Sequence, residues 1–167
     1  MELIYETKKL RVLKLVLDDL NPFYKMQSNP NVMRFVKPTT LSFEENKADL
    51  IRLISLYDTP KNDFWIYAIE RKSDNEFVGS VALVKDEGDD EIGYRFLEKY
   101  WGLGYGSDVV NGLIAYCKKS GFKKLVAYVA VENVASRKIV EGLGFEFTEN
   151  TFCKDLGIPE KKYCLVL

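Results

Sequence analysis

Three glycines at alternate positions, Gly102, Gly104 and Gly106, separate a predicted strand at Glu91–Leu97 from a helical pattern that ends near Gly121. A glycine-rich turn that leads into a helix presents unpaired backbone N–H groups and the positive end of the helix dipole to an anion. Phosphate or pyrophosphate is the usual ligand of such a turn. The same turn without any ligand is the alternative that this pattern leaves open when it is taken alone.

The spacing of these glycines does not match the common nucleotide motifs. A P-loop requires a lysine directly after its last glycine, and none follows here. A dinucleotide fold places GxGxxG early in a βαβ unit, whereas this chain has GxGxG late in the sequence, after strands that we expect to be antiparallel. A nucleotide-binding module is therefore the weakest interpretation of the turn.

Composition narrows the chemistry further. The 167 residues include 24 basic and 25 acidic side chains, a net charge of −1, and no histidine. Near-zero charge argues against nucleic acid as a partner, because such binding depends on clustered lysine and arginine. The absence of histidine excludes Ser-His-Asp and Cys-His nucleophile systems and most catalytic zinc sites, so we expect no metal.

Cysteine usage and hydropathy bear on the compartment. Cys117, Cys153 and Cys164 are widely spaced and form no CxxC pair, which favours a reduced cytoplasmic setting over a disulfide scaffold. Neither a secretory signal nor an apolar run long enough to span a membrane is visible, so no membrane partner is expected. With no repeat or linker, we expect one domain over residues 1–167, as a monomer or a homodimer.

Periodicity predicts the order of the elements. In the first half, we expect a strand at Lys9–Leu17, helix starts at Asn21-Pro22 and Asn29-Pro30, a helix from the capping box Ser42–Glu45 to Leu56, and a hairpin of Phe64–Glu70 and Phe77–Val84. The helix is expected to turn Leu50, Ile51, Leu53 and Ile54 toward the core.

In the second half, the acidic segment Asp86–Asp90 is expected to be a turn before the strand Glu91–Leu97. The helix after the glycines presents Val109, Val110, Leu113, Ile114 and Cys117 on one face. We then expect a strand at Leu125–Val131, a helix at Asn133–Gly142, and strands at Gly144–Thr148 and Lys161–Leu167. This order predicts an α+β fold with a mixed, largely antiparallel sheet and one parallel crossover.

Two segments carry a family resemblance. The stretch Tyr94–Ser107 resembles the acetyl-CoA-binding motif of the GNAT superfamily of N-acetyltransferases, and Val131–Phe145 resembles the family's Asn-x-x-(Ala/Ser) helix that ends in Leu-Gly-Phe. The opening strand and the Trp-Gly-x-Gly-Tyr form are similar to the branch that acetylates N-terminal amines of ribosomal proteins and assorted small amines. The resemblance covers nearly the whole chain in the expected order.

The resemblance implies acetyl-CoA as cosubstrate. In such folds the strand before the glycine turn splays from its neighbour, and the pantetheine arm pairs with the free backbone groups. Phe96 and Leu97 are expected to supply those groups, while Asn133 caps its helix and faces the pantetheine. The diphosphate is expected at the amides of Leu103, Gly104, Tyr105, Gly106 and Ser107, and Trp101 and Gly102 are the other cofactor-binding candidates of the turn. Trp101 stands where the family usually has Gln or Arg.

The implied reaction is direct transfer of acetyl to a primary amine, which must lose a proton. Glu91 is the first candidate for the base and Glu70 the second, and either is equally readable as a solvated strand end. The N–H of Leu97 is expected to stabilise the oxyanion. Many relatives protonate the leaving thiolate with a tyrosine at the position of Val140, so Ser136, one turn earlier, is the candidate here.

The acceptor is not encoded in any recognisable motif. Arg34, Phe35, Trp65, Tyr67 and Tyr163 are candidates for the acceptor cleft, although aromatic residues at strand spacing are more often core. The acidic segment Asp86–Asp90 is a candidate to attract a cationic amine. A ribosomal-protein N-terminus, an amino acid, a polyamine and an aminoglycoside all fit. A non-catalytic acyl-CoA-binding domain is the alternative function, and Val140 is the best argument for it.

Overall fold

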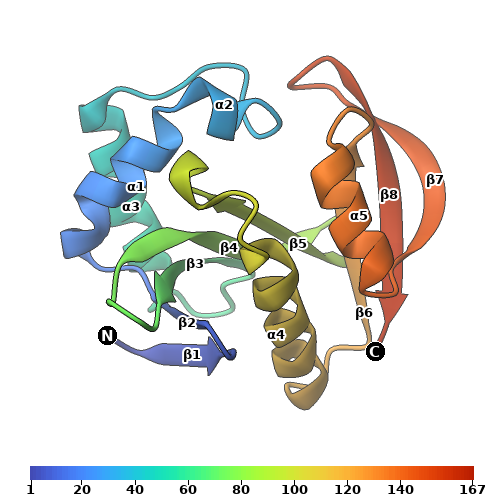
Figure 1. The fold of residues 1–167 in the computed structure, drawn as a ribbon, viewed down its shortest axis with the longest axis horizontal. Helices are drawn as coiled ribbons and strands as arrows, with labels where there is room; N and C mark the ends of the chain where they lie inside the picture. Colours follow the sequence, from blue (N-terminus) through green and yellow to red (C-terminus); the bar gives the residue numbers. More distant parts are fainter.

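The computed structural model describes residues 1–167 and contains one eight-stranded sheet with helices on both faces (Figure 1). The strand order is β1-β2-β3-β4-β5-β6-β8-β7. Every neighbouring pair is antiparallel except β5 and β6, which are parallel and connected through α4. The predicted α+β fold with one parallel crossover is confirmed. None of the helices is both long and apolar enough to cross a membrane.

The first half of the chain forms one edge of the sheet and the helices that cover one of its faces. Its elements are β1 (Leu3–Glu6), β2 (Leu10–Lys14), a 3-10 turn (Leu17–Asp19), α1 (Leu20–Gln27), α2 (Pro30–Met33) and α3 (Phe43–Leu56). The predicted first strand is too long, since Val16 N–H donates to the Asp19 carboxylate at 2.9 Å and turns the chain out of the sheet. Strand β1 was not predicted.

The second half supplies the remaining strands and the helices α4 and α5. Its elements are β3 (Phe64–Arg71), β4 (Phe77–Asp86), β5 (Asp89–Phe96), a 3-10 turn (Glu98–Tyr100), α4 (Tyr105–Lys119), β6 (Lys124–Ala130), α5 (Val134–Gly142), β7 (Glu146–Cys153) and β8 (Ile158–Val166). The predicted acidic turn is wrong in extent. Only Glu87 and Gly88 form the turn, with φ of 45° and 91°, the backbone of a tight two-residue hairpin.

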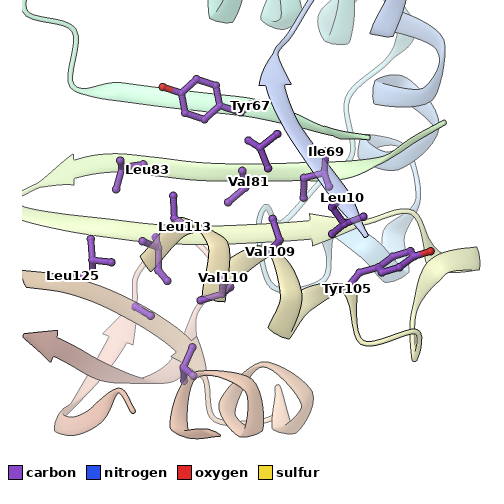
Figure 2. Packing of buried hydrophobic residues seen from close by; sticks show 14 of the residues in the cluster. Leu10, Tyr67, Ile69, Val81, Leu83, Tyr105, Val109, Val110, Leu113 and Leu125 are labelled. Carbon is purple, nitrogen blue, oxygen red and sulfur yellow. The ribbon is translucent and has the colours of Figure 1, made fainter. Parts of the chain in front are cut away.

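Two apolar cores lie on opposite faces of the sheet. Under α4, the predicted helix face buries Val109, Val110 and Leu113 against the strands (Figure 2). On the other face, α1 and α3 bury a smaller cluster that includes Leu50 and Leu53. Ile51 was expected in the core but is 49% exposed, because the face of α3 that contacts the sheet is narrower than predicted. Each face of the sheet is therefore covered by its own helices.

Candidate active site

A cavity of about 1020 Å³ lies where β5 meets the glycine turn and the start of α5. Most of the sequence-predicted site residues line it: Glu91, Phe96, Trp101, Gly102, Gly104, Tyr105, Gly106, Ser107, Asn133 and Ser136. Leu97 and Leu103 are outside the lining, and Leu103 is exposed at the tip of the turn. Residues from α2 and from the β7–β8 turn close the remaining walls.

The cavity enters the sheet through a gap between β5 and β6. These strands pair at a single position, Glu91 with Val126, and diverge beyond it, so the predicted splay is confirmed. On the other edge of β5, Leu97 N–H donates to Val78 O at 2.9 Å. Because backbone groups alternate along a strand, the N–H groups of Tyr94 and Phe96 point the opposite way, into the gap.

This register corrects the role expected of Leu97. Its N–H already has a backbone partner on β4, so it is not free to stabilise an oxyanion or to pair with a cofactor arm. Phe96 has the predicted orientation, although its carbonyl already accepts a hydrogen bond from the indole Nε1 of Trp101 at 3.0 Å. Trp101 therefore ties the glycine turn to the end of β5, a contact that the sequence analysis did not foresee.

The start of α4 is open to an anion. Its N-cap is Gly104, which has a left-handed backbone at φ 77° and no side chain to cap the helix. A Cβ added to Gly102 or Gly104 would meet no atom within 4 Å, so open space lies beside both residues. The first amides of α4 consequently lack side-chain partners, as a phosphate-binding turn requires.

Helix α5 begins as predicted. Asn133 is its N-cap, and the Asn133 side-chain oxygen accepts from Ser136 N–H at 3.1 Å. The Nδ2 group of Asn133 makes no hydrogen bond within the protein and lies in the cavity wall. The Ser136 hydroxyl lies 2.8 Å from the Tyr94 hydroxyl, which reaches it from β5. Val140, in the place of the family's tyrosine, is buried.

Tyr94 was missed as a site residue. Its hydroxyl lines the cavity beside Ser136, and burial raises the pKa of this phenol. The only sequence signal was indirect: Val140 leaves the expected hydroxyl position empty. Nothing in the local pattern shows that a tyrosine 42 residues earlier supplies a hydroxyl to the same place.

Glu91 also lies in the cavity wall, but on the face of β5 opposite to that of Tyr94. Burial, together with the nearby negative charges of Asp86 and Glu160, raises the pKa of its carboxyl group to about 7. Burial also raises the pKa of Glu160. A carboxylate with a pKa near neutrality is able to take a proton from an amine and release it to water.

Comparison with known proteins decides the family. A family model described as "Acetyltransferase (GNAT) domain" matches residues 9–146, which is most of the chain. The chain belongs to the GNAT acetyltransferase family. The predicted resemblance is thereby confirmed, and the activity class of the family is acetyl-CoA-dependent acyl transfer.

Individual GNAT relatives agree. "Uncharacterized N-acetyltransferase YoaA" of Bacillus subtilis is 26% identical over 148 residues, which cover 86% of this chain and 82% of the relative. An acetyltransferase (GNAT family) from Bacillus anthracis has a TM-score of 0.85 at 19% identity and covers 97% of both chains. RimL, a ribosomal L7/L12 alpha-N-protein acetyltransferase in complex with coenzyme A, has a TM-score of 0.82 at 17% identity, covering 99% of this chain and 98% of RimL. These structural likenesses show the GNAT fold.

The second candidate base, Glu70, does not lie at the site. Glu70 lies on β3, outside the cavity lining, and its carboxylate forms an ion pair with Arg11 at 2.8 Å. An ion-paired carboxylate two strands away from the gap has no access to the amine. The pairing joins β2 to β3, so it was not visible in the local sequence.

The aromatic candidates for the acceptor cleft also lie elsewhere. Trp65 and Tyr67 stack with Tyr57 at centroid distances of 6.2 and 6.0 Å, outside the cavity lining. Trp65 lines a separate cavity of about 600 Å³. Tyr163 is buried, and its hydroxyl donates to Glu141 at 2.9 Å. Of the expected aromatic residues, only Phe35 lines the site cavity.

The charged candidates divide between the cavity and its surroundings. Asp86 and Glu87 line the cavity. Asp89 instead forms ion pairs with Lys124 and Lys162, and Asp90 with Lys85, so these carboxylates are neutralised away from the site. Arg34 is not in the lining either; it bonds Glu132 at 2.7 Å beside the lining residue Asn133.

Arg95 is a further cavity residue that the sequence analysis did not single out. It lies on the same face of β5 as Glu91, since the strand pairs with β4 in unbroken register. Its guanidinium points toward α1 and α2, where it contacts Gln27 and Met33. One face of β5 thus offers a carboxylate and a guanidinium, and the other face the Tyr94–Ser136 pair.

Proposed function

We propose that the protein is a single N-acetyltransferase domain over residues 1–167 that transfers acetyl from acetyl-CoA directly to a primary amine. The observation that carries this proposal is that the β5–β6 gap and the uncapped start of α4 open into one cavity. When bound, acetyl-CoA would supply an activated acetyl thioester. An acyl-CoA-binding domain without activity predicts the same cavity, so turnover is the deciding property.

Cofactor binding is assigned to backbone groups. The amides of residues 103–107 would hold the diphosphate, with the helix dipole of α4 favouring negative charge there. The gap-facing amide of Phe96 would pair with the pantetheine arm. The Asn133 Nδ2 group would donate to an arm carbonyl, since its Oδ1 is used by the helix cap.

Proton removal is assigned to Glu91. An ammonium substrate must become a neutral amine before it attacks, and the chain has no histidine to accept the proton. With its pKa raised to about 7, the Glu91 carboxylate is a stronger base than an ordinary glutamate. It takes the proton from the substrate nitrogen on the α1–α3 face of the sheet, directly or through one water.

Stabilisation of the negative charge that develops on the reacting thioester is assigned to Tyr94 and its neighbours. The gap-facing N–H of Tyr94 replaces that of Leu97 as the oxyanion donor. On the α4–α5 face, Ser136 would donate a hydrogen bond to the departing sulfur while Tyr94 donates to Ser136. Burial raises the pKa of Tyr94, so the pair hydrogen-bonds the thiolate and the sulfur takes its proton from water.

Direct transfer is supported by the shortage of acyl-carrying nucleophiles. The cavity wall has one thiol, Cys153 on β7, and no lysine. Direct transfer predicts that the protein incubated with acetyl-CoA alone keeps its mass, whereas an acetyl-enzyme would gain one acetyl group. The cysteines are unpaired, which supports the cytoplasmic location that we propose.

Release of free thiol tests the function. The protein is mixed with acetyl-CoA and a panel of peptides and small amines, and a thiol reagent follows coenzyme A. We expect thiol release that depends on one class of amine. Tight binding of coenzyme A without release on any amine would instead support the non-catalytic alternative.

A further inference from the structure

Arg95 is a charged residue of the cavity wall without a charged partner. Its Nε donates to Ser80 Oγ at 3.2 Å, and its Nη1 lies 3.3 Å from Gln27 Oε1 and 3.5 Å from Met33 Sδ. These contacts are long and all go to neutral atoms. Its Nη2 makes no hydrogen bond within the protein. The carboxylate of Asp49, which acts on Arg95 through space, is itself bonded to Arg52 at 2.8 Å.

The guanidinium of Arg95 has hydrogen-bond donors that no protein group uses. Burial lowers the pKa of Arg95 to about 10, so the guanidinium stays charged at neutral pH. The Nη2 atom is not sealed inside the protein, so its donors are open to the cavity, and a planar guanidinium is suited to a carboxylate or phosphate. The free Nη2 donors are therefore best explained by an anion that enters the cavity.

Between Glu91 and Arg95, the cavity-facing side of β5 carries no side chain, because the residue there is Gly93. Gly93 lies between them on the same face, and a Cβ added there would meet only the Ala82 Cβ at 3.7 Å, an ordinary contact. Neither space nor a left-handed backbone requires glycine at this position. Glycine inside a strand often marks the close approach of a ligand. Gly93 also lines the cavity, so a substrate is able to lie flat against β5 here.

We propose that the acceptor is an amine that also carries a carboxylate, as in an amino acid, with its amino group at Glu91 and its carboxylate at Arg95. This inference rests on the proposed function and adds the substrate class. The two residues are four positions apart along the strand, so their Cα atoms are about 13 Å apart, which leaves room between their side chains for a small zwitterion. A polyamine is disfavoured, because its second ammonium would face the guanidinium.

Pairs of acceptors that differ only in a carboxylate test whether the site prefers an acceptor with that group. L-amino acids are compared with the corresponding amino acid amides, and peptides that begin with Asp are compared with peptides that begin with Asn. We expect kcat/KM to be at least about tenfold higher for the anionic member, the effect of a charge-assisted hydrogen bond. Preference for the free amino acid identifies a small-molecule acceptor, and preference confined to the Asp peptide identifies a peptide. Equal rates within both pairs would overturn the proposal.

The variants Arg95→Met and Arg95→Lys test whether the preference for anionic acceptors depends on the Arg95 side chain. The methionine variant should lose it through a higher KM for the anionic acceptor, with a much smaller loss on the amide and little change in the KM for acetyl-CoA. The lysine variant should restore part of it. Because the hydrogen bonds that Arg95 makes are long and go to neutral atoms, and methionine keeps an apolar side chain in the same place, Arg95→Met should change the thermal midpoint little. Equal losses on both acceptors with a lower midpoint would show that Arg95 only holds α1 and α2, and would overturn the proposal.

A binding readout separates this inference from the proposed function. An amino acid that fits should raise the thermal midpoint of the coenzyme A-loaded protein, and Arg95→Met should abolish the increase. Stabilisation without any turnover would contradict the proposed function and still support the anion subsite. Turnover of amines without either stabilisation or a preference for anionic acceptors would support the function and overturn the subsite.

Discussion

Glu91 and Tyr94 lie three residues apart on β5 and point to opposite faces of the sheet, because the strand keeps an unbroken register with β4. Glu91 faces the side covered by α1 and α3, near Asp86 and Glu160. Tyr94 faces α5, where it meets Ser136 at 2.8 Å. The two residues therefore place the two ends of the acetyl-transfer reaction on different faces of the strand. The amine is deprotonated on one face of the strand, and the sulfur departs on the other.

Glu91→Gln should lower kcat by about 10²-fold and remove the rise of the rate through pH 7, since an amide has no proton to accept. The measurement is the pH dependence of kcat for the best acceptor. Glu160→Gln is the matched variant: removing this neighbouring negative charge lowers the pKa of Glu91, so the rise should move to lower pH. A Glu91→Gln profile identical to the wild type would place the base elsewhere.

Stability provides a control on the same carboxyl group. Its folded pKa, about 7, exceeds its ordinary value of 4.5, so the folded state binds more protons than the unfolded state between these values. Wild-type stability contributed by this group is therefore greatest below pH 4.5 and falls as pH rises toward 7. The thermal midpoint of Glu91→Gln should exceed that of the wild type above pH 7, and the difference should shrink in acid.

Tyr94→Phe should lower kcat about tenfold while the KM for acetyl-CoA stays unchanged, because the hydroxyl acts through Ser136 on the departing sulfur. If the two hydroxyls act as one unit, the double variant with Ser136→Ala should be no slower than Ser136→Ala alone. Tyr116→Phe, a tyrosine of α4 that stacks on Tyr5 outside the cavity, is the control. Multiplicative losses in the double variant would contradict the coupling.

Asn133→Asp and Asn133→Ala separate capping from cofactor binding. Aspartate keeps the oxygen that accepts from Ser136 N–H but lacks the Nδ2 donor. It should retain the wild-type thermal midpoint and raise the dissociation constant of coenzyme A. Alanine should also raise the dissociation constant of coenzyme A, and in addition it should lose about 1 kcal/mol of stability because the helix cap is missing. Unchanged affinity in the aspartate variant would leave Asn133 as a helix cap only.

Gly104→Asp should abolish the thermal stabilisation by coenzyme A, because a carboxylate would stand among the amides that hold the diphosphate. The backbone strain of an L residue at φ 77° costs about 1–2 kcal/mol. Gly121→Asp is matched for this strain, with φ 87°, open space around the added Cβ and a place beyond the other end of α4. It should lose at least as much stability, because its charge lies at the negative end of the α4 dipole, and keep the response to coenzyme A.

Local signals in the sequence were reliable where neighbouring residues decide the structure. Ser42 and Glu45 form the predicted capping box, and Asn133 caps α5 as expected. Both depend on contacts three residues apart, which a sequence shows directly. The glycine turn belongs to the same class, because its backbone angles are properties of the glycines themselves.

Residues whose roles depend on strand pairing were not predictable in the same way. The loss of Leu97 as a donor follows from its pairing with Val78, and the loss of Glu70 from its ion pair with Arg11. A shift of one residue in register would exchange the orientations of Leu97 and Phe96. The hydroxyl of Tyr94 and the guanidinium of Arg95 enter the site through contacts with residues far along the chain.

A crystal structure of the protein with acetyl-CoA would show where the diphosphate and the thioester-bearing arm bind. We expect the diphosphate to accept hydrogen bonds from the amides of residues 103–107 and the thioester-bearing arm to lie beside Phe96 in the β5–β6 gap. A cofactor bound elsewhere, or a gap filled by protein side chains in the complex, would contradict this expectation.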